Sequence, residues 1–77
     1  DYTPEFCIIV KPEQEDNAFF SKITETLQEN AGPCPVYMYF MSSKKMIKSN
    51  REFWIDGSET VVNNLKNLLG KNSIKQR

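Results

Sequence analysis

Residues 53–70, FWIDGSETVVNNLKNLLG, decide the fold that this sequence can adopt. Apolar residues recur within the segment at helical spacing, which predicts a helix with one face that must be covered. These residues are Val61, Val62, Leu65, Leu68 and Leu69. Asp56 is the expected N-cap, Glu59 completes a capping box, and Gly70 supplies the left-handed residue that commonly ends a helix. The segment carries no reactive group, so its expected role is structural.

The rest of the chain supplies strands and one more helix. Phe20, Ile23 and Leu27 lie at helical spacing and predict a first helix, which Gly32 is expected to end. Apolar and β-branched runs predict the strands. The expected elements are, in order, a strand at residues 6–10, a helix from Asp16 or Asn17 to about Asn30, strands at 36–41 and 45–49 joined by a turn, the helix within 53–70 and a strand at 73–75.

The order β-α-β-β-α-β predicts a single two-layer α+β domain. In such a domain a four-stranded sheet carries both helices on one face. A ferredoxin-like strand order is the default expectation for this arrangement of elements. Residues 1–5 contain a proline and acids and resemble a linker from an upstream domain, so we expect residues 6–77 to form the domain.

The alternation of side chains along the strands predicts which residues face the helices. The expected core positions are Phe6, Ile8, Val10, Val36, Met38 and Phe40. The residues between them are also largely apolar and fall on the face without helices. We therefore expect an interaction face made of Cys7, Ile9, Tyr37, Tyr39 and Met41. Large exposed apolar patches usually mark contact surfaces, so this face is the best functional clue in the strands.

The chain has 77 residues, of which 39% are hydrophobic and 26% are charged. This composition is typical of a soluble globular protein. No apolar run approaches the roughly 20 residues that a membrane helix needs. Asp1 in place of a methionine suggests a piece of a longer protein. Cys7 and Cys34 are too few for a disulfide framework, and we expect reduced thiols in a cytosolic protein.

The net charge is zero, but the charges are unevenly distributed. Residues 1–31 hold seven acids and two bases, whereas residues 32–77 hold eight bases and three acids. Such an asymmetry can orient a partner electrostatically. The alternative interpretation is two solvated surfaces of opposite charge.

Candidate catalytic groups are few. The sequence has no histidine, which excludes Ser-His and Cys-His nucleophiles. Its three glycines are turn or cap residues and form no phosphate loop. The acids Glu13, Glu15 and Asp16 fit a solvated helix start better than a metal site, because no fourth ligand converges on them. We expect no enzyme activity, no cofactor and no metal in these residues.

Nucleic-acid binding is the alternative from a different functional class. Lys44, Lys45, Lys48 and Arg51 form a candidate basic patch close to aromatic residues of the preceding strand. Rings that stack on bases and cations that hold phosphates are typical of single-strand binding modules. However, the aromatic residues do not occupy the first and third strands, where an RNA-recognition module carries them. A solvated hairpin is the competing interpretation of the same charges.

The second half of the sequence resembles a known family. The segments GPCPVYMYF, KKMIK and FWIDGSETVVNNLKNLLGKNSI follow one another as in the extreme C-terminal domain of the bacterial DNA polymerase III alpha subunit. The resemblance covers residues 30–75 and depends on the combined order of residues that are individually common. The matching positions are Gly32, Pro35, Val36, Trp54, Leu65, Leu69, Gly70 and Ile74.

The resemblance implies a non-catalytic tail of a replicative polymerase in the bacterial cytoplasm. The metal-binding carboxylates of that family lie in an upstream domain, and nothing in these residues matches them. The implied partners are the upstream domains of the polymerase and the tau subunit of the clamp loader. One departure from the family is Gly57, which stands where a proline is frequent.

Overall fold

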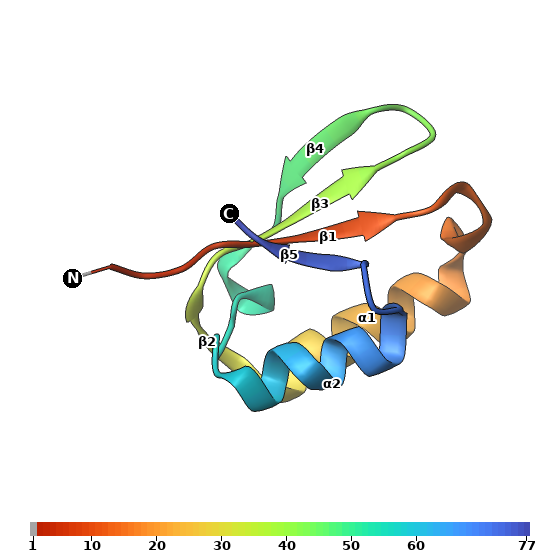
Figure 1. The fold of residues 1–77 in the computed structure, drawn as a ribbon. Helices are drawn as coiled ribbons and strands as arrows, with labels where there is room; N and C mark the ends of the chain where they lie inside the picture. The colour runs from red at the N-terminus through yellow and green to blue at the C-terminus, as the bar shows by residue number, and fades with distance from the viewer. Residues whose placement is uncertain (1) are drawn as a thin grey trace.

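The chain folds into a four-stranded mixed sheet with two helices packed on one face, as the computed structural model of residues 2–77 shows (Figure 1). The predicted two-layer α+β class is confirmed. The elements are β1 (Phe6–Val10), η1 (Pro12–Gln14), α1 (Asn17–Glu29), β2 (Ala31–Cys34), β3 (Val36–Phe40), β4 (Lys45–Lys48), η2 (Arg51–Phe53), α2 (Glu59–Leu69) and β5 (Ile74–Gln76). Of the expected linker, Asp1 lies outside the described residues, and residues 2–5 form no helix or strand.

The strand order is β4-β3-β1-β5, with β1 parallel to β3 and the two outer pairs antiparallel. The expected ferredoxin-like order is therefore wrong. That order places the strand at residues 45–49 beside β1, whereas the structure has β3 between them. Composition explains the difference. The apolar β3 takes the central position, whereas all four residues of the lysine-flanked β4 are exposed at the edge. Exposed edges that carry lysines also discourage pairing with other chains.

The core lies between the sheet and the helices. Ile8, Val10 and Val36 are fully buried, as are Ile23 and Leu27 of α1. The other helix adds Val61, Leu65 and Leu69 to the same apolar cluster. Burial of a large aliphatic side chain contributes about 1.5 to 3 kcal/mol relative to leaving it exposed, so this layer supplies most of the stability. The predicted inward alternation of β1 is confirmed.

The helices start at polar caps. The backbone N–H of Phe19 donates to the Asp16 carboxylate at 2.8 Å, which confirms the predicted start of α1. The prediction for α2 is wrong by two residues. Its N-cap is Ser58, which accepts from the N–H of Val61, while the Asp56 carboxylate accepts from the N–H of Ser58 at 3.1 Å. The chain remains extended until then because Ile55 bridges to β2.

Gly32 is not the residue that ends α1. The helix ends at Glu29 with Asn30 as its C-cap, and Gly32 belongs to β2. There its N–H donates to the carbonyl of Trp54 at 3.1 Å. A Cβ atom at Gly32 would lie 2.7 Å from the carbonyl carbon of Ile55 and would collide with the backbone of Asp56 as well. This close backbone approach requires glycine.

We expect Gly32→Ala to lower the free energy of unfolding by about 1 to 3 kcal/mol, because the backbone has to move away from the added methyl group. Urea unfolding followed by circular dichroism measures the loss. Ser43→Ala, in the exposed turn between β3 and β4, is the control and should change the stability by less than about 0.5 kcal/mol. Equal stability of Gly32→Ala and the unmodified chain would contradict the close pairing of β2 with Ile55.

Candidate interaction face of the sheet

The face of the sheet away from the helices carries most of the predicted interaction residues. The register aligns Cys7 with Tyr37 and Ile9 with Tyr39. Residues that face each other across a ladder share one face, and Ile8 between them is buried against the helices. Met41, the fifth predicted residue, follows the end of β3 in the turn and is 46% exposed. The structure thus brings Cys7, Ile9, Tyr37 and Tyr39 together.

One row of this face is cationic and aromatic. Lys75, Cys7, Tyr37 and Lys48 lie opposite one another across all four strands. The guanidinium of Arg77 lies 4.3 Å from the centre of the Tyr37 ring, and the Lys48 ammonium lies 5.7 Å from the same centre. A cation over an aromatic ring at these distances is attracted by the electrons of the ring. The Tyr37 ring therefore attracts both cations.

Trp54 lies just beyond the end of β4 and adds a second ring to this group of cations. The Lys48 ammonium and the Arg51 guanidinium each lie 5.2 Å from the centre of its ring. The indole N–H donates to the carbonyl of Ser49 at 3.2 Å, which fixes the ring beside the end of β4. We refer to the six residues of this surface as the cation–aromatic row: Tyr37, Lys48, Arg51, Trp54, Lys75 and Arg77.

The next row of the same face is apolar. Ile9, Tyr39 and Met46 lie opposite one another on β1, β3 and β4, and we refer to them as the apolar row. Met46 is 49% exposed, and Ile9 and Tyr39 are partly exposed. Methionine adapts its shape to apolar partners, which suits it to contact surfaces. This row was only partly predicted, because Met46 was not assigned to a face.

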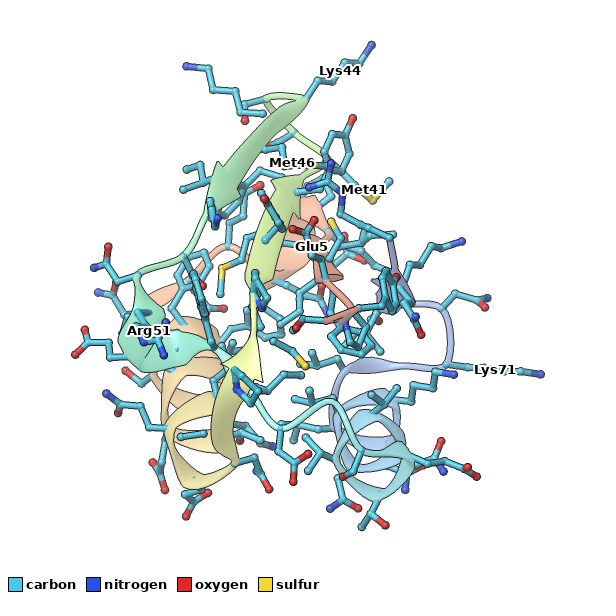
Figure 2. The ribbon with its side chains drawn as sticks, turned by 90° about the vertical axis from the view of Figure 1, so that its left-hand side faces the viewer. Glu5, Met41, Lys44, Met46, Arg51 and Lys71 are labelled. Atoms are coloured by element: carbon cyan, nitrogen blue, oxygen red, sulfur yellow. The ribbon has the colours of Figure 1, made fainter. Side chains whose placement is uncertain are left out.

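The predicted basic patch does not form one cluster. Lys48 and Arg51 meet at Trp54, whereas Lys44 lies in the turn at the tip of the hairpin with a positive φ of 57°. Lys45 lies opposite Phe40, on the side of the sheet that faces the helices. Figure 2 shows Lys44 projecting from the hairpin tip, well away from Arg51.

The sequence did not lead us to predict three members of the cation–aromatic row. These are Lys75, Arg77 and Trp54, which was expected only as a position of the family resemblance. The lysine and the arginine follow Ile74, which is buried, so the alternation of the last strand was a signal that places both on the opposite face. The position of Trp54 depends on the η2 turn and had no comparable signal.

Cys7 lies beneath this face rather than on its surface. Its side chain is only 7% exposed, and burial raises the pKa of the thiol. The Arg77 cation and a hydrogen bond from the Tyr39 backbone act in the opposite direction and lower that pKa. Because the thiolate is the reactive form, the net rise makes Cys7 a poor nucleophile.

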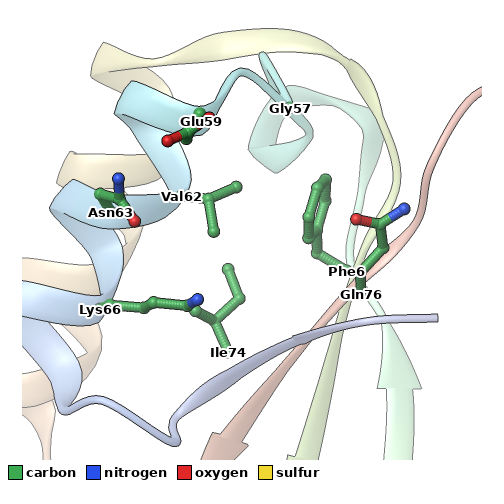
Figure 3. A pocket seen from close by; sticks show the side chains of 8 residues that line it. All are labelled: Phe6, Gly57, Glu59, Val62, Asn63, Lys66, Ile74 and Gln76. Carbon is green, nitrogen blue, oxygen red and sulfur yellow. The ribbon is translucent and has the colours of Figure 1, made fainter.

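A pocket lies between α2 and β5. This cavity of about 310 Å3 has an apolar floor of Phe6, Val62 and Ile74 (Figure 3). Its rim is polar and consists of Gly57, Glu59, Asn63, Lys66 and Gln76. The charged groups of this rim are one carboxylate, Glu59, and one ammonium, Lys66.

A second, more open groove lies between α1 and the hairpin. It has a volume of about 350 Å3 and is lined mainly by apolar side chains, including Phe20, Phe40, Ile47 and Phe53. Ile47 is 53% exposed at its outer edge and points to the side of β4 opposite Met46. The hairpin therefore presents an exposed apolar residue on each of its two sides.

Comparison of the chain with protein-family models, with curated proteins and with solved structures finds no match. Across residues 2–77, no three histidine, cysteine or acidic side chains lie close enough together to hold a metal ion. Within the same residues, neither helix has the length and apolar character needed to cross a membrane.

The burial of Cys7 predicts slow chemical modification. In a Cys34→Ala background, we expect a thiol reagent at pH 8 to react with Cys7 at least tenfold more slowly in the native protein than in urea, because burial both shields the thiol and raises its pKa. The release of the chromophore from an aromatic disulfide reagent measures the rate. Equal rates in both conditions would show that Cys7 is exposed on the face.

Proposed function

We propose that this chain is a non-catalytic interaction domain that docks another protein against the apolar row. The observation that supports the proposal is the row itself. Ile9, Tyr39 and Met46 are aligned across three strands on the face that neither helix covers. Contact surfaces of proteins are enriched in tyrosine and methionine at their centres, and a few such residues usually supply most of the binding energy.

The surroundings of the apolar row suit such a contact. Met41 extends the accessible apolar surface beyond the end of β3, and the cations of the neighbouring row form a polar border. Charged residues at the border of an interface affect association rate and orientation more than affinity. A partner with an apolar centre and an acidic margin would therefore dock in one orientation.

The identity of the partner rests on the family resemblance. We propose that the chain is the terminal domain of a DNA polymerase III alpha subunit and acts in DNA replication in the bacterial cytoplasm. The partner is then a neighbouring domain of the polymerase or the tau subunit of the clamp loader. In this proposal, nucleotide transfer belongs to the upstream part of the polymerase, and these residues need no cofactor of their own.

Replacement of two side chains of the apolar row tests the docking proposal. We expect Tyr39→Ala with Met46→Ala to weaken binding to tau, or to the upstream domains, by at least tenfold, because truncation of interface anchors commonly costs more than about 1.4 kcal/mol. Surface plasmon resonance with the tau subunit and the upstream domains of the same bacterium measures the loss. Circular dichroism should show an unchanged fold, since neither side chain is in the core cluster.

Ile47→Ala is the matched control, because it removes an equally exposed aliphatic side chain from the other side of β4. Its binding should remain within twofold of the unmodified chain. If Ile47→Ala abolished binding and the double variant bound normally, docking would use the groove beside α1 instead. If neither tau nor the upstream domains bound the unmodified chain, the proposed partners would be wrong.

A further inference from the structure

We propose that the cation–aromatic row binds single-stranded nucleic acid, with phosphates on its cations and bases stacked on its rings. This activity goes beyond the proposed docking function and does not depend on it, because docking is centred on the apolar row and contacts the cation–aromatic row only at its border. The proposed site keeps Lys48 and Arg51 of the predicted basic patch, but Lys75 and Arg77 take the place of Lys44 and Lys45.

The geometry of the row suits an extended strand. Lys75 and Lys48 mark its two ends on the sheet, with Tyr37 between them. Neighbouring strands lie about 4.8 Å apart, so three spacings separate these ends by about 14 Å. Trp54 and Arg51 add a further ring and cation next to Lys48, beyond the end of β4. A path of this length across a sheet accommodates several nucleotides, as in known single-strand binding folds.

Cations and rings alternate along the path. Arg77 lies over Tyr37, Lys48 lies between Tyr37 and Trp54, and Arg51 lies on Trp54, with separations of 4.3 to 5.7 Å. Bases stack on aromatic rings and on guanidinium planes, and adjacent cations hold the phosphates. The alternation places both kinds of group within reach of each nucleotide.

The charge of the row is almost uncompensated. Lys48, Arg51, Lys75 and Arg77 supply four positive charges, and the ion pair recorded within residues 2–77 joins Arg77 to Glu5 at 3.9 Å. Both partners are partly exposed to water, so this pair contributes little and a phosphate can compete for the guanidinium. The ligand is therefore anionic.

The rings favour a nucleic acid over an acidic protein segment. Carboxylates of a peptide would pair with the cations, but they cannot stack on the rings of Tyr37 and Trp54. Bases use the rings as well, because every base has a flat face that stacks on an aromatic ring. The position of Tyr37 on a central strand also matches the way in which sheet-based modules present their stacking residues.

Binding of a fluorescein-labelled oligothymidylate of about 20 nucleotides tests the proposal. Fluorescence anisotropy with the 77-residue chain at about 50 mM salt should give a dissociation constant between about 1 and 100 micromolar. Three or four phosphate contacts predict a fall in affinity of about 20- to 50-fold between 50 and 200 mM salt. Absence of binding at about 0.5 mM protein would overturn the proposal, since sequence-independent contacts of this kind are stronger than that.

Variants locate the site. Lys48→Ala with Arg77→Ala should weaken binding at least tenfold, whereas Lys44→Ala with Lys71→Ala, which removes the same charge from the hairpin tip and from beyond α2 (Figure 2), should stay within threefold. Tyr37→Leu should lose at least fivefold and Tyr37→Phe should bind normally, because stacking needs a ring. If both double variants lost the same affinity, binding would depend only on the net charge of the chain, and the proposal would be overturned.

Two further measurements separate the competing explanations. An acidic peptide of the same net charge as the oligonucleotide should bind at least tenfold more weakly, and equal affinity would assign the row to acidic protein segments instead. The docking variant Tyr39→Ala with Met46→Ala should keep its affinity for oligothymidylate. Failure of docking with normal nucleic-acid binding, or the reverse, would therefore remove one proposal and leave the other.

Discussion

The parallel pairing of β1 with β3 is the constraint on which the rest of the structure depends. Its register places Ile8 and Val36 under the helices and Tyr37 and Tyr39 on the opposite face. Because side chains alternate, a slip of one residue would exchange the two faces and bury the tyrosines. The hairpin then adds β4 at one edge and α2 delivers β5 to the other, which aligns both rows across the sheet.

Both helices cover the same face of the sheet and leave the other face without a helical layer (Figure 1). A chain of this size buries only about 60 to 65% of its unfolded surface, so it has little stability to spare. Its apolar cluster lies on one side of the sheet. The segment that leads into α2 is fixed to β2, because Ile55 pairs with Ala31 and Cys34. The residues of the helix-free face, including the buried Cys7, lie outside that cluster. Residues on this face can therefore serve binding without loss of the fold.

Much of this structure follows from the sequence, and the exceptions have physical reasons. Periodicity located both helices and the inner face of β1, since those signals are local. The strand order was missed because element order alone does not choose the central strand, although the exposed character of Lys45–Lys48 indicated an edge. The cap of α2 was misplaced because Ile55 stays paired with β2. The alternation after the buried Ile74 indicated the face of Lys75 and Arg77, whereas Trp54 joins their row only through long-range packing, which no local pattern encodes.

Accessibility of the helix-free face is the claim on which both proposed binding modes rest, and its methionines measure it directly. Met46 lies in the apolar row and Met41 beside it, whereas Met38 packs against the core. Solvent paramagnetic relaxation of the three 13C-labelled methyl groups with a soluble gadolinium chelate compares them in one sample. We predict strong relaxation of Met46 and Met41 and weak relaxation of Met38. Protection of Met46 equal to that of Met38 would show that the face is covered and would contradict the account.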